Sequence, residues 1–120
     1  MTNKIDITSY KKGLRAENHA CWWLRLQGFR ILGQRIKTPL GELDILAKRG
    51  KLLCVVEVKY RRTIDEAAYA ITHKQKNRVR DAAELYLAAR PDITKAVEEI
   101  RFDAILMAAR HFPRHIKNAW

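Results

Sequence analysis

Three residues that could perform metal-dependent chemistry lie in one stretch, residues 41–62, which reads GELDILAKRGKLLCVVEVKYRR. Asp44 lies in one apolar run, and Glu57 and Lys59 lie in the next, where a buried sheet is expected to hold no charge. The two runs predict antiparallel strands, and the glycine in the turn at 48–51 can adopt a positive φ. Two carboxylates and an ammonium group are suited to holding a divalent cation beside a phosphate.

The alternation of side chains along a strand decides which of these groups share a face. Glu57 and Lys59 are two residues apart, so they point to the same face. A two-residue turn at Arg49-Gly50 would make Asp44 the diagonal neighbour of Glu57, and a four-residue loop would place the two directly opposite. A bulge or an odd-length loop would separate them.

Two neighbouring carboxylates repel each other, and burial favours their protonated forms. A divalent cation removes this conflict, and oxygen ligands suit magnesium or manganese. Lys59 would then orient a water molecule or stabilise charge on a phosphate. The alternative is an ordinary half-exposed strand whose charges face solvent, which is a common pattern in sheets.

The chain is strongly basic, with 24 Lys and Arg against 13 Asp and Glu and a formal net charge of +11. This excess favours a polyanionic partner, and nucleic acid is the commonest. A basic surface without a single partner, or a ribosome-associated protein, would have the same composition. The length of 120 residues predicts one domain, with residues 1–9 as a loose arm and 109–120 as a basic tail.

Cys21 and Cys54 lie in apolar patterns and are expected to be buried thiols in a reducing compartment. The N-terminus has no apolar leader, and no run is long enough to cross a bilayer, so we expect a cytoplasmic protein without a membrane partner. His111 and His115 have a spacing that can hold zinc, but no third ligand accompanies them.

The elements that would position these residues follow from hydrophobic periodicity and from Gly and Pro breaks. A helix is expected over 10–27 and strands over 29–36, 43–47 and 52–60. A helical pattern over 64–90 has a break near Thr72, and a strand follows over 99–108. Three consecutive strands predict an antiparallel meander, and the strand–helix–strand order predicts a parallel crossover. The fold class is therefore α/β, with a mixed four-stranded sheet flanked by helices.

Glu17 falls inside the apolar stripe of the first helix, with Leu14, Cys21 and Leu24. An acid on a buried face is costly unless it is paired or bound to a ligand, so Glu17 is a candidate site residue. Because this helix is apolar on most sides, Glu17 could instead lie at the edge of the buried face.

Gln75 also has two interpretations. Thr72 and Gln75 fit a capping box, in which the glutamine only supports the helix N-terminus. Gln75 is also in line with Ile71 and Val79, so its side chain would face inward. The lysines and arginines on the same turns are spread over two sides of the helix, where a solvated basic face is the usual outcome.

These residues, in this order, resemble the PD-(D/E)XK nuclease superfamily. Within it the chain is similar to the YraN-type family of small bacterial predicted endonucleases, which is itself similar to archaeal Holliday-junction resolvases. The matching residues are Gly13 with Glu17 and Ala20, Gly41-Glu42-Leu43-Asp44, Val56-Glu57-Val58-Lys59-Tyr60-Arg61, Lys74-Gln75, Arg101-Phe102-Asp103 and Ile116-Lys117-Asn118-Ala119-Trp120. In the segment before Gly41, Arg35 and 37–40 depart from the family's asparagine and glycine-rich pattern.

The resemblance implies a restriction-endonuclease-like core and a role for each residue. Asp44 and Glu57 would bind Mg²⁺ or Mn²⁺ together with the Val58 carbonyl, and Glu17 would hold the metal or its water. Lys59 would position or activate the attacking water. Gln75 would support the site from the second helix.

The resulting hypothesis is a magnesium-dependent endodeoxyribonuclease that hydrolyses phosphodiester bonds in branched or otherwise structured DNA. Phosphate contacts would come from a basic group of residues, namely Arg61, Arg62, Lys74, Lys76 and Arg78. The first alternative is a nucleic-acid-binding module without catalysis, and a ribosomal-RNA-binding protein is the second. Resolvase-like relatives act as homodimers, so a homodimer is expected by analogy.

Overall fold

The computed structural model describes residues 3–120, and the side chains from Tyr10 onward. The elements in chain order are α1 (Asn3–Leu26), β1 (Arg30–Thr38), β2 (Gly41–Arg49), β3 (Leu52–Arg61), α2 (Ile64–Tyr69), α3 (His73–Ala88), α4 (Pro91–Thr94), β4 (Glu99–Ala108) and β5 (Arg114–Ile116). The first helix already begins at Asn3, so residues 3–9 are helical where the sequence predicted a loose arm.

The fold is mixed α/β, as predicted, but the sheet has five strands in the order β1-β2-β3-β4-β5. Strands β3 and β4 are parallel, and the other neighbouring pairs are antiparallel. The prediction of four strands was wrong because residues 114–116 of the basic tail pair with 104–106 of β4. Three residues are too few to show a strand period in the sequence.

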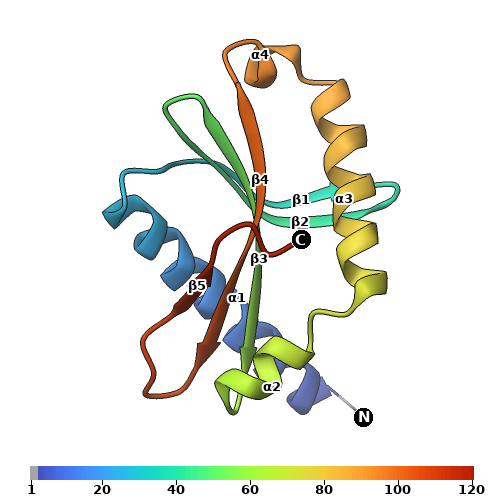
Figure 1. Cartoon of the computed structure of the whole chain (residues 1–120). Coiled ribbons are helices and arrows are strands. Elements are labelled where there is room, and N and C mark those ends of the chain that lie inside the picture. The colour runs from blue at the N-terminus through green and yellow to red at the C-terminus, as the bar shows by residue number, and fades with distance from the viewer. Residues whose placement is uncertain (1–2) are drawn as a thin grey trace.

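Helices cover both faces of the sheet (Figure 1). The α1 face of the core contains Leu24, Val56 and Ile105, among other buried residues. On the opposite face, α3 packs on Leu46 and Val55 of the sheet, and α2 packs further along β4. Burial of these two apolar layers fixes the helices against the sheet.

The β2–β3 hairpin has the register in which Asp44 comes opposite Glu57. Arg49 pairs with Leu52, and the pairing continues to Ile45 with Val56. The turn therefore consists of Gly50 and Lys51, and Gly50 has a φ of 61°, which glycine adopts without the usual steric cost. This is the register predicted for a four-residue loop, but it is produced by a two-residue turn that lies one position later than the predicted Arg49-Gly50.

The predicted break near Thr72 separates α2 from α3. Thr63 caps α2 by accepting a hydrogen bond from Glu66 N, and Thr72 caps α3 by accepting one from Gln75 N. Both caps satisfy backbone N–H groups that lack an intrahelical acceptor. Together the two helices connect β3 to the parallel strand β4.

Cys21 and Cys54 are buried free thiols, as predicted. Burial, as the largest cause, raises the pKa of Cys54 to about 12, so its reactive thiolate is strongly disfavoured. Within residues 3–120, no helix has the length and apolar character needed to cross a membrane.

Candidate active site

Asp44 lies where β2 and β3 stop pairing. The last paired residues are Ile45 and Val56, and Asp44 is the next residue of β2. Its Oδ2 accepts a hydrogen bond of 2.9 Å from the backbone N of Val58. The carboxylate thus accepts the hydrogen bond that Val58 N would otherwise donate to a backbone carbonyl of a neighbouring strand. This bond holds the carboxylate close to the plane of the sheet.

Glu57 lies beside Asp44 and is 3% exposed. Its Oε1 accepts a hydrogen bond of 2.9 Å from Gln75 Nε2 and lies 3.4 Å from Lys59 Nζ. Its Oε2 is buried without a hydrogen-bond partner among the described residues. The side chain of Gln75 therefore faces inward and contacts the site. Of the capping box, the structure shows the bond from Gln75 N to Thr72 Oγ1, while the glutamine side chain is bonded to Glu57 instead.

The electrostatics of the pair favour retention of a proton. Burial, followed by repulsion from Asp44, raises the pKa of Glu57 to about 8, against the lowering effect of Lys59. Burial also raises the pKa of Asp44, while the hydrogen bond from Val58 N lowers it. Two carboxylates whose pKa values are both raised do not both ionise readily near neutral pH. A buried acid pair that keeps a proton near neutral pH is a frequent feature of functional sites.

Glu17 approaches the same place from α1. It is 8% exposed and flanked on the helix by buried Ala16 and Ala20, so it belongs to the inner face rather than to its edge. Burial, followed by the charge of Asp44, raises its pKa to about 7. Its Oε1 is buried without a hydrogen-bond partner in the described part of the chain.

Arg35 joins the site although sequence reasoning assigned it no role there. Its Nε lies 3.9 Å from Glu17 Oε1 and 3.9 Å from Glu42 Oε1. Its backbone φ of 50° is uncommon for a residue with a side chain, and it interrupts the regular extended backbone of β1 at Arg35. In the sequence, Glu42 appeared only as part of the Gly41-Glu42-Leu43-Asp44 segment that resembles the nuclease family. No sequence signal predicts the backbone conformation of Arg35.

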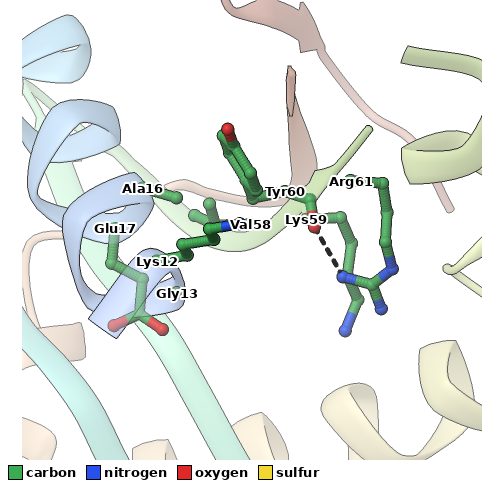
Figure 2. A pocket seen from close by; sticks show the side chains of 8 residues that line it. All are labelled: Lys12, Gly13, Ala16, Glu17, Val58, Lys59, Tyr60 and Arg61. Atoms are coloured by element: carbon green, nitrogen blue, oxygen red, sulfur yellow. Dashed lines mark hydrogen bonds between the residues drawn. The ribbon is translucent and has the colours of Figure 1, made fainter. Parts of the chain in front are cut away.

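A pocket of about 440 Å³ opens beside these acids. Figure 2 shows Glu17 from α1 and Lys59 from β3 on its opposite walls, with Lys12 between them. Gly13 also lines it, one helical turn before Glu17, and a Cβ there would meet no atom within 4 Å. Asp44 and Glu57 do not line this pocket, but Lys59 does, and its Nζ lies 3.4 Å from Glu57 Oε1.

The oxygen atoms of these side chains are of the chemical type that binds Mg²⁺. Asp44 and Glu57 provide carboxylate oxygens, and the unpartnered Glu57 Oε2 and Glu17 Oε1 have unused acceptor capacity. Within the described residues, no group of three or more His, Cys, Asp or Glu side chains is arranged to hold a metal. Magnesium commonly binds through one or two carboxylates together with water and substrate phosphates, which an Asp44–Glu57 pair can support.

The residues of the predicted basic group make different contacts. Arg61 lines the pocket, and Lys74 is exposed at the start of α3. Arg62 is paired with Glu66 at 3.1 Å. Lys76 lies over the Trp120 ring, with its Nζ 6.0 Å from the ring centroid. Arg78 packs against the backbone at Gly41. The structure thus brings Glu17, Asp44, Glu57, Lys59 and Gln75 together, while only Arg61 of the basic group lines their pocket.

Comparison of the sequence with known proteins assigns the chain to a family. The model of "Uncharacterised protein family UPF0102" matches residues 16–107. A UPF0102 protein of Nitrobacter winogradskyi is 46% identical over 116 residues, which are 97% of each chain. Relatives from Bradyrhizobium diazoefficiens and Rhodopseudomonas palustris BisB5 are each 46% identical over 95% of this chain and over 84% and 86% of their own lengths. The chain belongs to the UPF0102 family.

Proposed function

We propose that this UPF0102 member is a metal-dependent endonuclease that hydrolyses phosphodiester bonds in branched or otherwise structured DNA. The observation that carries the proposal is the meeting of Glu17, Asp44, Glu57 and Lys59 at the gap between β2 and β3. Three raised carboxyl pKa values beside a half-buried lysine are costly to stability. A site that binds a cation and a phosphate explains why such an arrangement persists.

Asp44 and Glu57 would hold Mg²⁺ or Mn²⁺, with the Val58 carbonyl as a further ligand. The bound cation supplies Lewis-acid polarisation of the phosphate and makes water a stronger nucleophile. Gln75 keeps the Glu57 carboxyl oriented through its hydrogen bond to Oε1. Because the pKa of Glu57 is raised, binding of the cation would be accompanied by release of a proton.

Lys59 is placed to act on both the acid pair and the substrate. Its Nζ is 3.4 Å from Glu57 Oε1, and its side chain reaches the pocket beside Glu17. From there its ammonium group can orient a water molecule for in-line attack and stabilise the charge that develops on the phosphate. Glu17, on the opposite wall, can accept a hydrogen bond from the same water.

Similarity to the PD-(D/E)XK superfamily, and to its YraN-type and resolvase-like members, supports this proposal. The described arrangement is compatible with a restriction-endonuclease-like core, and the acid-x-lysine of β3 is Glu57-Val58-Lys59. Expectations of a homodimer and of a cytoplasmic location come from the same resemblance and composition, and they remain predictions.

The test is incubation of the purified protein with labelled duplex, flap and four-way DNA in the presence of Mg²⁺ or Mn²⁺. We expect cleavage by the wild type and its loss in Asp44→Asn and Lys59→Ala, because these variants remove a metal ligand and the water-orienting ammonium group. The matched control is Lys48→Ala, which removes a lysine from β2 outside the site and should cleave normally. Cleavage that persists in the Asp44 and Lys59 variants would refute the assignment.

Titration calorimetry separates the enzyme from a binding module. An enzyme of this kind should bind Mn²⁺ through Asp44 and Glu57, and Asp44→Asn should abolish the metal signal. Salt-sensitive DNA binding without metal binding would show a module that grips nucleic acid and does not cut it.

A further inference from the structure

A second pocket, of about 330 Å³, adjoins the pocket beside Glu17. The two share a wall made by Lys12, Ala16 and Tyr60, so together they form one groove along α1. At its far end the groove is bordered by Arg110 and His111, which follow β4. Figure 1 shows that the ends of β3 and β4 and the N-terminal half of α1 lie at the same end of the molecule.

The lining of the second pocket is cationic. It contains Lys12, Arg15 and Arg110 together with the rings of His19 and His111. None of the described residues that line it is an acid, and none of these lysines and arginines forms an ion pair with a described side chain. Free cations facing a common hollow attract an anion more strongly than cations that a carboxylate has already neutralised.

The spacing of the helix residues makes this lining a continuous row. Lys12, Arg15 and His19 follow the i, i+3, i+7 pattern, so they lie on one face of α1. Seven residues of helix rise about 10 Å, which is enough to face more than one phosphate of a strand. Arg110 lines the same pocket from the turn after β4. In this turn His111 N donates a hydrogen bond to Ala108 O, and Arg110 has a φ of 62°.

The α3 side of the molecule differs from this groove. Arg62 there is paired with Glu66, and Lys76 and Arg80 lie over the rings of Trp120 and Phe102. Such contacts hold these cations close to the protein, so they contribute less to the binding of an external polyanion.

We propose that the groove formed by α1 and the turn after β4 binds the phosphates of a nucleic-acid strand next to the bond to be cut. The inference rests on the proposed function, because that function places the reacting phosphate between Glu17 and Lys59. The strand passes from there over Lys12 and Tyr60 toward Arg15 and Arg110. Tyr60, half-buried on the shared wall, offers its ring to a base or sugar of the same strand.

The test measures binding of a labelled oligonucleotide by fluorescence anisotropy at increasing salt, in the presence of a chelator so that no cleavage occurs. The variant Lys12→Ala/Arg15→Ala/Arg110→Ala removes three phosphate contacts and should reduce the salt dependence, the slope of log K against log salt, by about two to three. Restoring charge with Arg15→Lys and Arg110→Lys should recover most of the slope. All these residues are exposed, so the variants are expected to fold, and thermal unfolding of each variant is the check.

The control variant, Arg30→Ala/Lys48→Ala/Lys95→Ala, removes the same charge near the opposite end of the sheet, and its slope should change by less than one. Lys51 is kept in this control because it is paired with Glu98 at 2.8 Å. Equal slopes for the two triple variants would overturn the proposal. A second measurement compares inorganic phosphate with chloride as competitors at equal ionic strength. If phosphate displaces the oligonucleotide much better than chloride does, the groove is a site for free phosphate and the proposal is overturned.

The two proposals fail separately. If the protein binds through the groove but never cleaves, the catalytic assignment is wrong and the groove assignment stands. If it cleaves, yet the groove variant cleaves and binds as the wild type does, only the groove assignment is wrong.

Discussion

Buried carboxylates lie on both faces of the central sheet, and they differ in how their oxygens are satisfied. On the α1 face, Asp103 is fully buried and accepts hydrogen bonds from Arg101, His115 and Asn118 N at 2.8–2.9 Å. On the α3 face, Glu57 keeps one buried oxygen without a hydrogen-bond partner among the described residues, and the charge of Asp44 repels its own.

The difference appears as opposite pKa shifts. Burial by itself raises the pKa of Asp103, but the hydrogen bonds from His115, Arg101 and Asn118 outweigh burial and hold it well below its usual range. Burial and repulsion raise the pKa of Glu57. A satisfied buried acid stabilises the fold, whereas an unsatisfied pair indicates a place kept for a ligand.

The largest effect is expected at Asp103. Asp103→Ala would leave Arg101 and His115 without their acceptor beneath the tail, and we expect a loss of about 3–5 kcal/mol in the free energy of unfolding. Urea unfolding measures it, with exposed Asp81→Ala as a control that should stay within about 0.5 kcal/mol of wild type. If Asp103→Ala does not fold, Asp103→Asn should show a smaller loss of about 1–3 kcal/mol. Wild-type stability in either variant would contradict the structural role of Asp103.

A smaller effect is expected at Gln75, which supports the other acid group. Gln75→Ala removes the donor to Glu57 Oε1 but keeps the backbone N that Thr72 caps, so α3 should remain intact. A lost supporting hydrogen bond of this kind typically lowers metal affinity by about 10–100-fold. Calorimetric titration with Mn²⁺ measures the loss. Asn77→Ala, an exposed amide on the same helix, is the control, and equal affinities of the two variants would argue against a supporting role.

A difference in the pH dependence of stability is expected at Glu57. The folded-state pKa of Glu57 lies above its unfolded value, so the folded protein retains a proton that the unfolded chain releases. The stability contribution is therefore full below about pH 4.3 and is lost as the pH rises toward about 8. Glu57→Gln should lack this decline, so the stabilities of the two proteins should diverge progressively as the pH rises across the window. Parallel stability curves for the two proteins would show that Glu57 ionises normally.

Asp103 supplies the opposite sign in the same experiment. Its folded-state pKa is lowered, so its contribution is present above about pH 4 and is lost as the solution becomes more acidic. The acid limb of the pH–stability curve therefore reports on Asp103, and the neutral limb reports on the acids with raised pKa values, Glu57 together with Glu17 and Asp44. Each limb can be assigned separately by Asp103→Asn and Glu57→Gln.

Local rules were enough to predict several parts of the structure. The alternation of β3 placed Glu57 and Lys59 on the face shared with Val55, and the structure has them there. The helix break and the cap at Thr72 also followed from local chemistry, because a hydroxyl satisfies a free N–H wherever a helix begins. Helical periodicity likewise placed Glu17 among buried residues.

Other features depended on contacts between residues far apart in the chain. The sequence allowed two registers for Asp44, and the turn at Gly50-Lys51 together with packing across three strands selected one. The pairing of β5 with β4 and the cluster at Asp103 join residues about a dozen positions apart, which no local period reveals.

By itself, the sequence determined which side chains could do chemistry and the strand faces that carry them, because side-chain direction repeats within each element. Tertiary structure alone decided how near the acids come to one another and which oxygens remain unsatisfied. It also decided that Lys12 and Arg110 border one groove. Distance and desolvation arise only when separate elements pack, so neither can be derived from any single segment of the chain.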